Sequence, residues 1–183
     1  MESCREGDDR PMNKSWLLAE LAGLCLLIGW FFLRPVPLPN RMLDTAVSLI
    51  LSEANEAITP ERFAQEGVQA TMLDVRARKE YDISHLPGAI HVGEQGEYLP
   101  DSLQFEDYIL VYCSIGKRSE KLMKVLQSRG FQRVRNLYGG IFAWAESGLP
   151  MESEGPSEAH VLHGYSPFWA RLTTYPSVYL ESN

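Results

Sequence analysis

Residues 108–120 read Y-I-L-V-Y-C-S-I-G-K-R-S-E, and this stretch decides the fold class. Residues 108–112 are aliphatic and aromatic throughout, which is typical of a strand buried on both faces of a parallel sheet. A helical pattern begins near Ser119 and runs to Arg129, and Gly130 follows where a helix-ending glycine belongs. A buried strand followed directly by an amphipathic helix indicates a strand–helix unit of the kind that builds parallel sheets.

The same alternation continues on both sides of this stretch. Apolar runs predict further strands over residues 70–75, 90–92 and 133–137. Helical periodicity predicts a helix over 42–54, one that starts at Thr59-Pro60-Glu61, and one over 141–147. The sequence therefore predicts an α/β domain around a mostly parallel sheet.

Cys113 is the residue in this pattern that carries chemistry. It stands where the central strand ends, and in open α/β sheets binding sites lie beyond the carboxyl ends of the strands. Gly116 allows the following loop to curl, so that backbone N–H groups and the helix N-terminus form a cradle for an anion. Lys117 and Arg118 add positive charge, and all these effects favour the thiolate over the thiol. The pattern predicts a nucleophilic cysteine whose substrate is itself an anion.

Sulfur transfer and phosphoester hydrolysis both suit such a cradle, and loop length favours the first. Phosphotyrosine-type phosphatases place an arginine six positions after the cysteine, whereas Arg118 is five positions after Cys113. The shorter loop suits a smaller group, such as a sulfane sulfur. A phosphatase or arsenate reductase stays open as a lesser alternative, and a buried, inert thiol is the default reading of any lone cysteine.

Four motifs together resemble the rhodanese family. They are L-D-V-R at 73–76 followed by Glu80-Tyr81, H-L-P-G-A-I-H-V at 85–92, V-Y-C-S-I-G-K-R-S at 111–119, and L-Y-G-G-I-F-A-W at 137–144. Each motif is weak alone, but four in order at the right spacing are specific. The resemblance implies a rhodanese-like fold, with a mostly parallel five-stranded sheet and helices on both faces.

The resemblance also implies an activity and a set of site residues. It implies a sulfurtransferase of the thiosulfate:cyanide or thiol type, in which Cys113 takes a sulfane sulfur from a small donor anion and the persulfide passes it to a thiol or cyanide. The cradle would be built by Ser114, Ile115, Gly116, Lys117, Arg118 and Ser119. Asp74 and Arg76 are expected as a supporting ion pair that shapes the pocket, and His85 as a hydrogen-bonding strut.

One departure from the family concerns the donor. Glu80 stands where two-domain thiosulfate enzymes of the family carry a basic residue that helps to hold the donor. A carboxylate there would repel a dianion, so the resemblance gives weaker support to thiosulfate as the natural donor than to sulfur transfer itself.

Residues 16–33, W-L-L-A-E-L-A-G-L-C-L-L-I-G-W-F-F-L, carry one charge in 18 positions. As a helix this run would be about 27 Å long, close to the thickness of a bilayer core. Aromatic residues near both ends and prolines just beyond are typical of a single membrane-spanning helix. We expect an uncleaved, single-pass anchor in the cell membrane, with a cleaved signal peptide as the alternative. The weak Lys/Arg bias favours a periplasmic or otherwise extracytoplasmic domain.

The chain thus divides into five parts by sequence. They are an N-terminal tail (1–15), the transmembrane anchor (16–33), a linker with an amphipathic helix (34–57), the rhodanese-like domain (58–150), and a polar linker with an aromatic tail (151–183). The tail is too short to fold alone, so residues 159–183 are expected to pack on the domain or on a protein partner.

Composition excludes some functions and leaves one alternative. The net charge is −7 and no basic cluster is present, so nucleic-acid binding has no support. Three cysteines without a Cys-x-x-Cys pair or Cys/His spacing give no metal site, and no cofactor is expected. The alternative function is a membrane-tethered module that uses the fold to bind a protein without turnover.

Overall fold

The computed structural model describes residues 22–25, 40–53, 56–154 and 161–178. The chain divides into two compact units, Met1–Pro35 and Val36–Asn183. Of the first unit, residues 22–25 are described and are helical. The predicted anchor at 16–33 therefore falls largely outside the described residues, and the helices that are described include none of the length and apolarity that a bilayer crossing requires.

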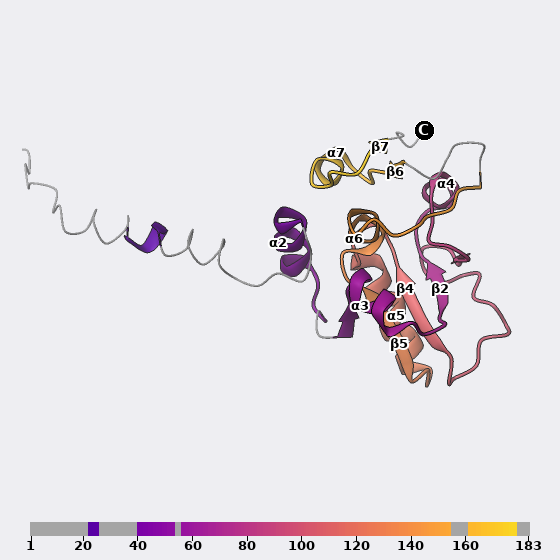
Figure 1. Ribbon diagram of the computed structural model, residues 1–183. Coiled ribbons are helices and arrows are strands. Elements are labelled where there is room, and N and C mark those ends of the chain that lie inside the picture. Colours follow the sequence, from indigo (N-terminus) through magenta and orange to yellow (C-terminus); the bar gives the residue numbers. More distant parts are fainter. Residues whose placement is uncertain (1–21, 26–39, 54–55, 155–160, 179–183) are drawn as a thin grey trace, which may run out of the picture. The chain divides into compact units, whose positions relative to one another are not determined.

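The second unit is built on a five-stranded sheet in which every pair of neighbouring strands is parallel (Figure 1). The strand order is β1-β5-β4-β2-β3. The strands are β1 (Ala57–Ile58), β2 (Thr71–Asp74), β3 (Ile90–His91), β4 (Tyr108–Tyr112) and β5 (Arg133–Leu137). The predicted strands at 108–112 and 133–137 match β4 and β5, and β4 is the central strand as expected.

Helices cover both faces of this sheet. Successive side chains of a strand point to opposite faces, so apolar residues on both sides of each strand need helices to pack against. Leu110 and Tyr112 of β4 join one core cluster, whereas Ile109 and Val111 join the other. The helices are α2 (Arg41–Ile50), α3 (Pro60–Glu66), α4 (Arg78–Ile83), α5 (Lys117–Ser128) and α6 (Gly140–Glu146). The second cluster contains the buried face of α5, and the first contains buried residues of the other four helices.

Two predicted helices differ from their observed bounds by two residues or more, and the helix predicted over 141–147 is shifted by one residue, to Gly140–Glu146. The helix after Cys113 begins at Lys117 rather than near Ser119, because Gly116 adopts a left-handed conformation (φ +100°) that turns the chain directly into the helix. The helix expected over 42–54 ends at Ile50, and Leu51 is already extended. Asn40 caps its start, since the Asn40 side chain accepts hydrogen bonds from the Met42 and Leu43 amides.

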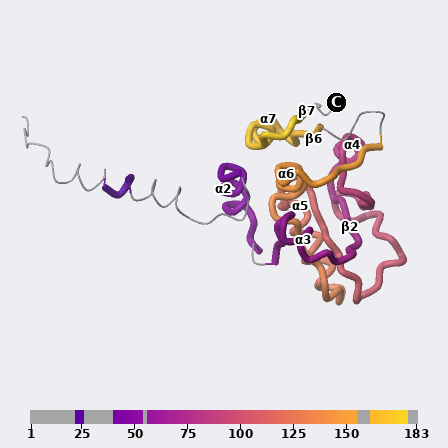
Figure 2. Tube along the Cα trace, in the orientation of Figure 1, coloured from indigo at the N-terminus to yellow at the C-terminus, as the bar shows by residue number. Residues whose placement is uncertain are grey.

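The segments that precede and follow the sheet domain in the sequence pack into its hydrophobic core. Leu43 and Val47 of α2 have no exposed surface and belong to the same cluster as the sheet residues. The C-terminal segment, residues 161–178, forms β6 (Leu162–His163), α7 (Pro167–Ala170) and β7 (Ser177–Val178), with β6 and β7 parallel to each other (Figure 2). Trp169 packs against the same cluster. The prediction that the aromatic tail packs on the domain is therefore confirmed for the described part.

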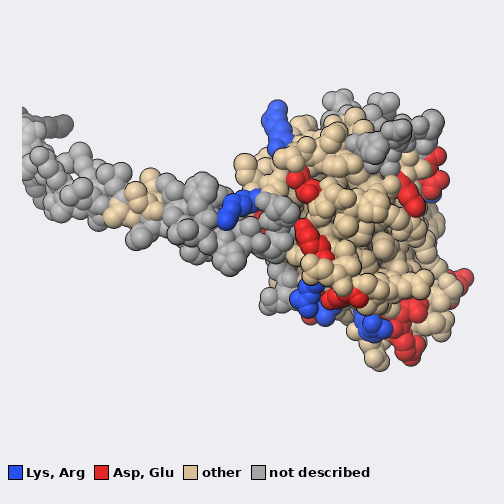
Figure 3. Space-filling view, viewed as in Figure 1, with Lys and Arg blue, Asp and Glu red and all other residues tan. Residues whose placement is uncertain are grey.

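Hydrogen bonds hold the C-terminal segment to two helices. Glu146 of α6 accepts hydrogen bonds from the hydroxyls of Thr173 and Thr174, at 2.8 Å each. The Asn40 side chain donates to the Leu172 carbonyl at 2.7 Å. On the face seen in Figure 3, most of the described surface belongs to residues other than Lys, Arg, Asp and Glu, and acidic and basic side chains are scattered over it. The segment thus packs as part of the domain, against α6 and the start of α2.

Candidate active site

Cys113 follows β4 directly, and its side chain has no exposed surface. The Gly116 amide donates a hydrogen bond to Cys113 Sγ at 3.2 Å. The residue nevertheless borders a cavity of about 390 Å³. The structure thus places Cys113 beside a partly open cavity at the carboxyl end of β4.

The loop carbonyls next to the sulfur are bound by the start of α6. The Ile141 amide donates to the Cys113 carbonyl at 2.9 Å, and the Phe142 amide donates to the Ser114 carbonyl at 3.2 Å. Gly140 makes this approach possible, because a Cβ at that position would lie 2.2 Å from the Cys113 carbonyl oxygen. The Gly139-Gly140 turn predicted from sequence therefore serves close packing against the loop.

A buried amide from β5 holds the Gly116 carbonyl. Asn136 Nδ2 donates to that carbonyl at 2.9 Å, and the Ser119 hydroxyl donates to Asn136 Oδ1 at 2.7 Å. These bonds fix the direction of the loop carbonyls. In the part of the chain that the structure describes, no hydrogen bond is found for the amides of Ser114 and Ile115. These two amides and the Gly116 amide are the candidate donors of the anion cradle predicted from the sequence.

Arg118 forms an ion pair with the carboxylate of Glu80. Its guanidinium makes two hydrogen bonds of 2.9 Å to the Glu80 carboxylate, which also accepts the Ser114 hydroxyl at 3.0 Å. Burial by itself would raise the pKa of Glu80, but the hydrogen bonds and charge of Arg118 outweigh it and bring that pKa down to about 2. Burial likewise opposes the charge of Arg118, yet Glu80 and the nearby Cys113 raise the pKa of its guanidinium.

The second cation of the loop is also paired. Lys117 Nζ lies 3.0 Å from the Glu120 carboxylate and 3.3 Å from the Ser52 hydroxyl. Burial opposes ionisation of Glu120, but the hydrogen bond from Lys117 and bonds from the backbone amides of Ser52 and Glu53 lower its pKa. From the sequence, the charges of Lys117 and Arg118 were counted in favour of the thiolate, and the structure gives each of them a carboxylate partner.

The cavity that Cys113 borders is also lined by residues that the sequence analysis did not assign to the site. Ile50 comes from the end of α2, and Tyr165 and Trp169 come from the C-terminal segment. The Arg118 guanidinium lies over the Tyr165 ring, 4.8 Å from its centroid. The apolar spacing of 42–54 and the aromatic content of 159–183 were visible in the sequence, but neither indicated which surface these residues cover.

Asp74 and Arg76 form the expected ion pair, and both side chains are fully buried. Arg76 Nη2 lies 2.7 Å from Asp74 Oδ2 and donates to the Ser84 carbonyl. Burial opposes the charge on Arg76, but Asp74 raises the pKa of its guanidinium nonetheless. Neither residue borders the cavity above Cys113, so the pair supports the strand ends from within the core.

The predicted residues of the loop separate into two groups. Those that border the cavity are Cys113, Ser114, Ile115, Lys117 and Arg118. Gly116 and Ser119 support the loop from behind, through the Gly116 carbonyl and the Ser119 hydroxyl. His85, expected as a strut, lies with Nδ1 3.0 Å from the Tyr81 carbonyl and stacks on the Tyr81 ring. Among the described residues no cluster of His, Cys, Asp or Glu is arranged to hold a metal ion.

Comparison with known proteins relates this chain to rhodanese-like domains and sulfurtransferases. Residues 59–147 match the model of the rhodanese-like domain. The chain is 33% identical over 107 residues to the thiosulfate sulfurtransferase GlpE of Actinobacillus pleuropneumoniae serotype 5b, covering 56% of this chain and 98% of that protein. It is 36% identical over 101 residues to GlpE of Actinobacillus succinogenes, covering 52% and 89%. The solution structure of a rhodanese-like domain from Anabaena sp. is 29% identical, with a TM-score of 0.48, over 57% of this chain and 86% of that one.

Proposed function

The chain belongs to the rhodanese-like family, and from this premise we propose that it transfers a sulfane sulfur through a persulfide on Cys113. The observation that carries the proposal is the loop of residues 113–118, whose first carbonyls are bound by α6 and whose Gly116 amide donates to Sγ. Amides directed at a sulfur stabilise its anion, and the thiolate is the form that attacks sulfur.

The proposed reaction has two balanced steps. The Cys113 thiolate attacks the outer sulfur of thiosulfate, the S–S bond of the donor breaks, and sulfite leaves with its electron pair. The persulfide that remains, Cys–S–S⁻, keeps one negative charge within the cradle. An acceptor thiolate or cyanide then attacks the terminal sulfur, and Cys113 is released as the thiolate. No general base is needed in either step.

The paired cations bear on the choice of donor. Because Glu80 and Glu120 offset the charges of Arg118 and Lys117, a doubly charged donor meets little net positive charge at the loop. Thiosulfate remains the donor proposed by similarity to the relatives named above. Its binding then depends mainly on the loop amides.

The experiment is direct mapping of the sulfur. The purified full chain is treated with thiosulfate, polysulfide or mercaptopyruvate, and intact mass followed by peptide mapping locates any added sulfur. We expect one added sulfur atom on Cys113, none in Cys113→Ser, and an unchanged result in the matched control Cys25→Ser. An unmodified wild-type chain with all three donors contradicts the proposal.

The fully buried Cys113 favours one second candidate, a protein-binding module without turnover. In that case a partner captured by the wild-type chain would bind Cys113→Ser equally well, and no donor would modify the wild type. Loss of binding when residues 151–183 are deleted would assign the partner surface to the C-terminal segment. Sulfur on Cys113 with turnover would exclude this candidate.

We also propose that residues 16–33 anchor the chain in the cell membrane as a single helix, with the domain on the extracytoplasmic side. The proposal is supported by 18 positions with one charge and by the prolines that follow. Alkaline extraction of membranes and a topology reporter fused after Asn183 test it. Release of the chain by alkali, or a reporter active only in the cytoplasm, contradicts it.

A further inference from the structure

The two most exposed aliphatic side chains of the described residues both lie on α2. Leu49 is 81% exposed and Met42 is 65% exposed. Seven positions are close to two turns of a helix, so both side chains project from the same face. Leu43 and Val47 on another face have no exposed surface and pack in the core. The helix therefore carries apolar side chains toward the core and also away from the domain.

The C-terminal segment lies beside α2 at both ends of the helix. At the start of α2, the Asn40 side chain donates to the Leu172 carbonyl at 2.7 Å. At its end, Ile50 lines the same cavity as Trp169. Residues 165–172 and α2 therefore run side by side, as the positions of α2 and α7 in Figure 1 also show.

This neighbouring segment exposes apolar rings of its own. Phe168 of α7 is 60% exposed, and its ring packs edge-on against Trp169 with centroids 5.2 Å apart. Tyr165 is 44% exposed. Single exposed apolar residues are ordinary, but several on adjoining segments mark a surface that binds something. Met42, Leu49, Tyr165 and Phe168 form what we call the α2–α7 patch.

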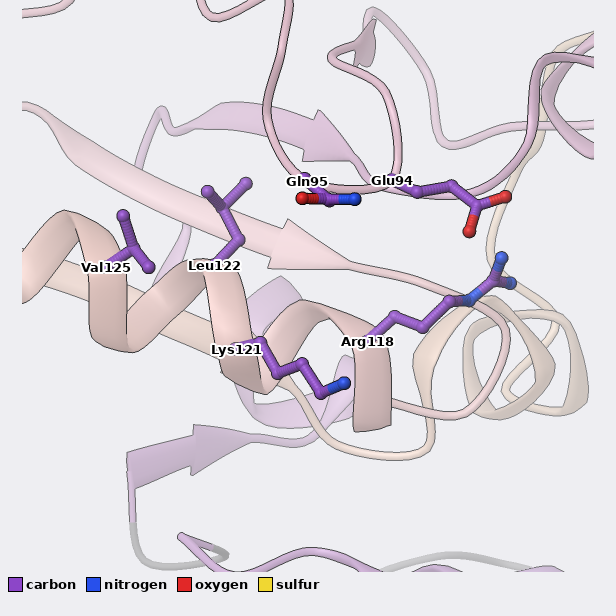
Figure 4. A pocket seen from close by; sticks show the side chains of 6 residues that line it. All are labelled: Glu94, Gln95, Arg118, Lys121, Leu122 and Val125. Carbon is purple, nitrogen blue, oxygen red and sulfur yellow. The ribbon is translucent and has the colours of Figure 1, made fainter.

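The cavities elsewhere on the domain are lined by charged side chains instead. A cavity of about 430 Å³ is bordered by Glu94, Arg118 and Lys121, and Figure 4 shows the Arg118 guanidinium extending toward the Glu94 carboxylate. A groove of about 560 Å³ at the opposite end of the sheet contains three arginines and two glutamates. Charged groups are costly to remove from water, so these surfaces suit solvent. The four members of the α2–α7 patch carry no formal charge.

The sequence places this patch close to the proposed membrane anchor. Residues 34–40, R-P-V-P-L-P-N, are all that separates the apolar run 16–33 from α2. A proline-rich linker of this length spans at most about 22 Å at about 3.1 Å per residue. A tether so short holds the patch near the bilayer at a high effective concentration, so a surface too weak to bind lipid alone becomes engaged.

We propose that the α2–α7 patch lies on the surface of the lipid bilayer in which residues 16–33 are anchored, with Leu49 and Phe168 inserted among the headgroups. The inference rests on the anchor proposed above and adds a second contact between the chain and the membrane. Because Ile50 and Trp169 line the cavity that Cys113 borders, this contact also places that cavity beside the bilayer.

The first test measures which medium surrounds the patch. The full chain, with its three native cysteines replaced by serine, receives one nitroxide label through Leu49→Cys, Phe168→Cys or the control Glu106→Cys, and is reconstituted in phosphatidylcholine vesicles. Glu106 is exposed and precedes β4, at the opposite end of the sheet from the Cys113 loop. Oxygen concentrates in lipid, whereas a charged nickel complex stays in water. We expect the ratio of oxygen to nickel collision rates to be about tenfold higher at positions 49 and 168 than at 106.

The second test asks whether the two parts of the patch bind together. In the chain labelled at Phe168→Cys, the further substitution Met42→Asp puts a charge on the outer face of α2. We expect it to raise nickel collisions at position 168 about threefold, because a charge on that face opposes contact with lipid. Val125→Asp is the matched control, since Val125 is an exposed apolar residue of α5 outside the patch, and it should change nothing.

Each other outcome overturns the inference in a recognisable way. A ratio at position 49 equal to that at 106 shows that water covers the patch. Shielding from both reagents shows a protein cover, which is a second copy where the spectrum is broadened by spin–spin coupling and another segment of this chain where it is not. Release of the chain from the vesicles by alkali overturns the anchor together with the patch. Sulfur mapping on Cys113 of the wild-type chain is independent of all these results, so the proposed sulfur transfer stands or fails separately.

Discussion

Replacing Glu80 by Gln removes the carboxylate that joins α4 to the Cys113 loop. Glu80 binds Arg118 through two hydrogen bonds, accepts the Ser114 hydroxyl, and accepts the Ala77 amide at 2.9 Å. Its side chain is 4% exposed, so solvent screens these interactions little. The pKa of Glu80 falls from 4.5 to about 2, which corresponds to about 3 kcal/mol of folding stability at neutral pH.

The sign of the pH dependence follows from the direction of that change. Because the folded-state pKa lies below the ordinary value, the contribution is fully present above pH 4.5 and is lost as the pH falls toward 2. About 2 kcal/mol of it should be lost by pH 3. The difference in unfolding free energy between wild type and Glu80→Gln should therefore be about 3 kcal/mol at pH 7 and about 1 kcal/mol at pH 3.

Urea unfolding of the full chain in a mild detergent, followed by circular dichroism at both pH values, measures this difference. Glu106→Gln is the matched control, because Glu106 is exposed on the surface, and its effect should stay within about 0.5 kcal/mol at both pH values. A difference for Glu80→Gln that is the same at pH 7 and pH 3, or that is absent at pH 7, refutes the reasoning that the ion pair with Arg118 stabilises the loop.

Three further substitutions test the parts of the structure that hold the loop. Gly140→Ala places a Cβ 2.2 Å from a backbone oxygen and should cost more than 3 kcal/mol or abolish sulfur transfer, whereas Gly148→Ala, with no atom within 4 Å of its Cβ, should cost only about 1 kcal/mol in the same urea titration. Asn136→Ala leaves the Gly116 carbonyl with one donor fewer and should cost about 2 kcal/mol; thermal unfolding and persulfide yield measure it, and an unchanged yield contradicts a role in loop geometry. Arg76→Met leaves a buried carboxylate unpaired and should cost about 3–5 kcal/mol, and a loss below 1 kcal/mol would show that the pair contributes little.

Much of the sheet domain was predictable because its signals are local. The apolar run of 108–112 and the glycine at 116 specify a buried strand and a tight turn whatever the rest of the chain does. The position of Cys113 follows, since the end of a parallel strand is where a binding site forms. The strand β1 is two residues long and was not predicted individually, because two residues are too few to show a period.

The environment of the sulfur depended on contacts between distant parts of the chain. Glu80 and Arg118 are 38 positions apart. The sequence alone does not indicate which Lys or Arg side chain pairs with the Glu80 carboxylate. Asn136 reaches the Gly116 carbonyl only because β5 lies beside β4. The order of strands in a sheet sets such neighbours, and spacing along the chain does not record it.

The sequence by itself determined the strand–turn–helix unit, the cysteine at its turn and the loop that follows it, because backbone conformation there follows from neighbouring residues. Only the tertiary structure decided that Glu80 pairs with Arg118, and that Ile50, Tyr165 and Trp169 line the cavity that Cys113 borders. The ion pair comes from the packing of α4 against the Cys113 loop, and the three lining residues come from the packing of α2 and residues 161–178 on the sheet domain. Such packing depends on complementary surfaces rather than on any local pattern.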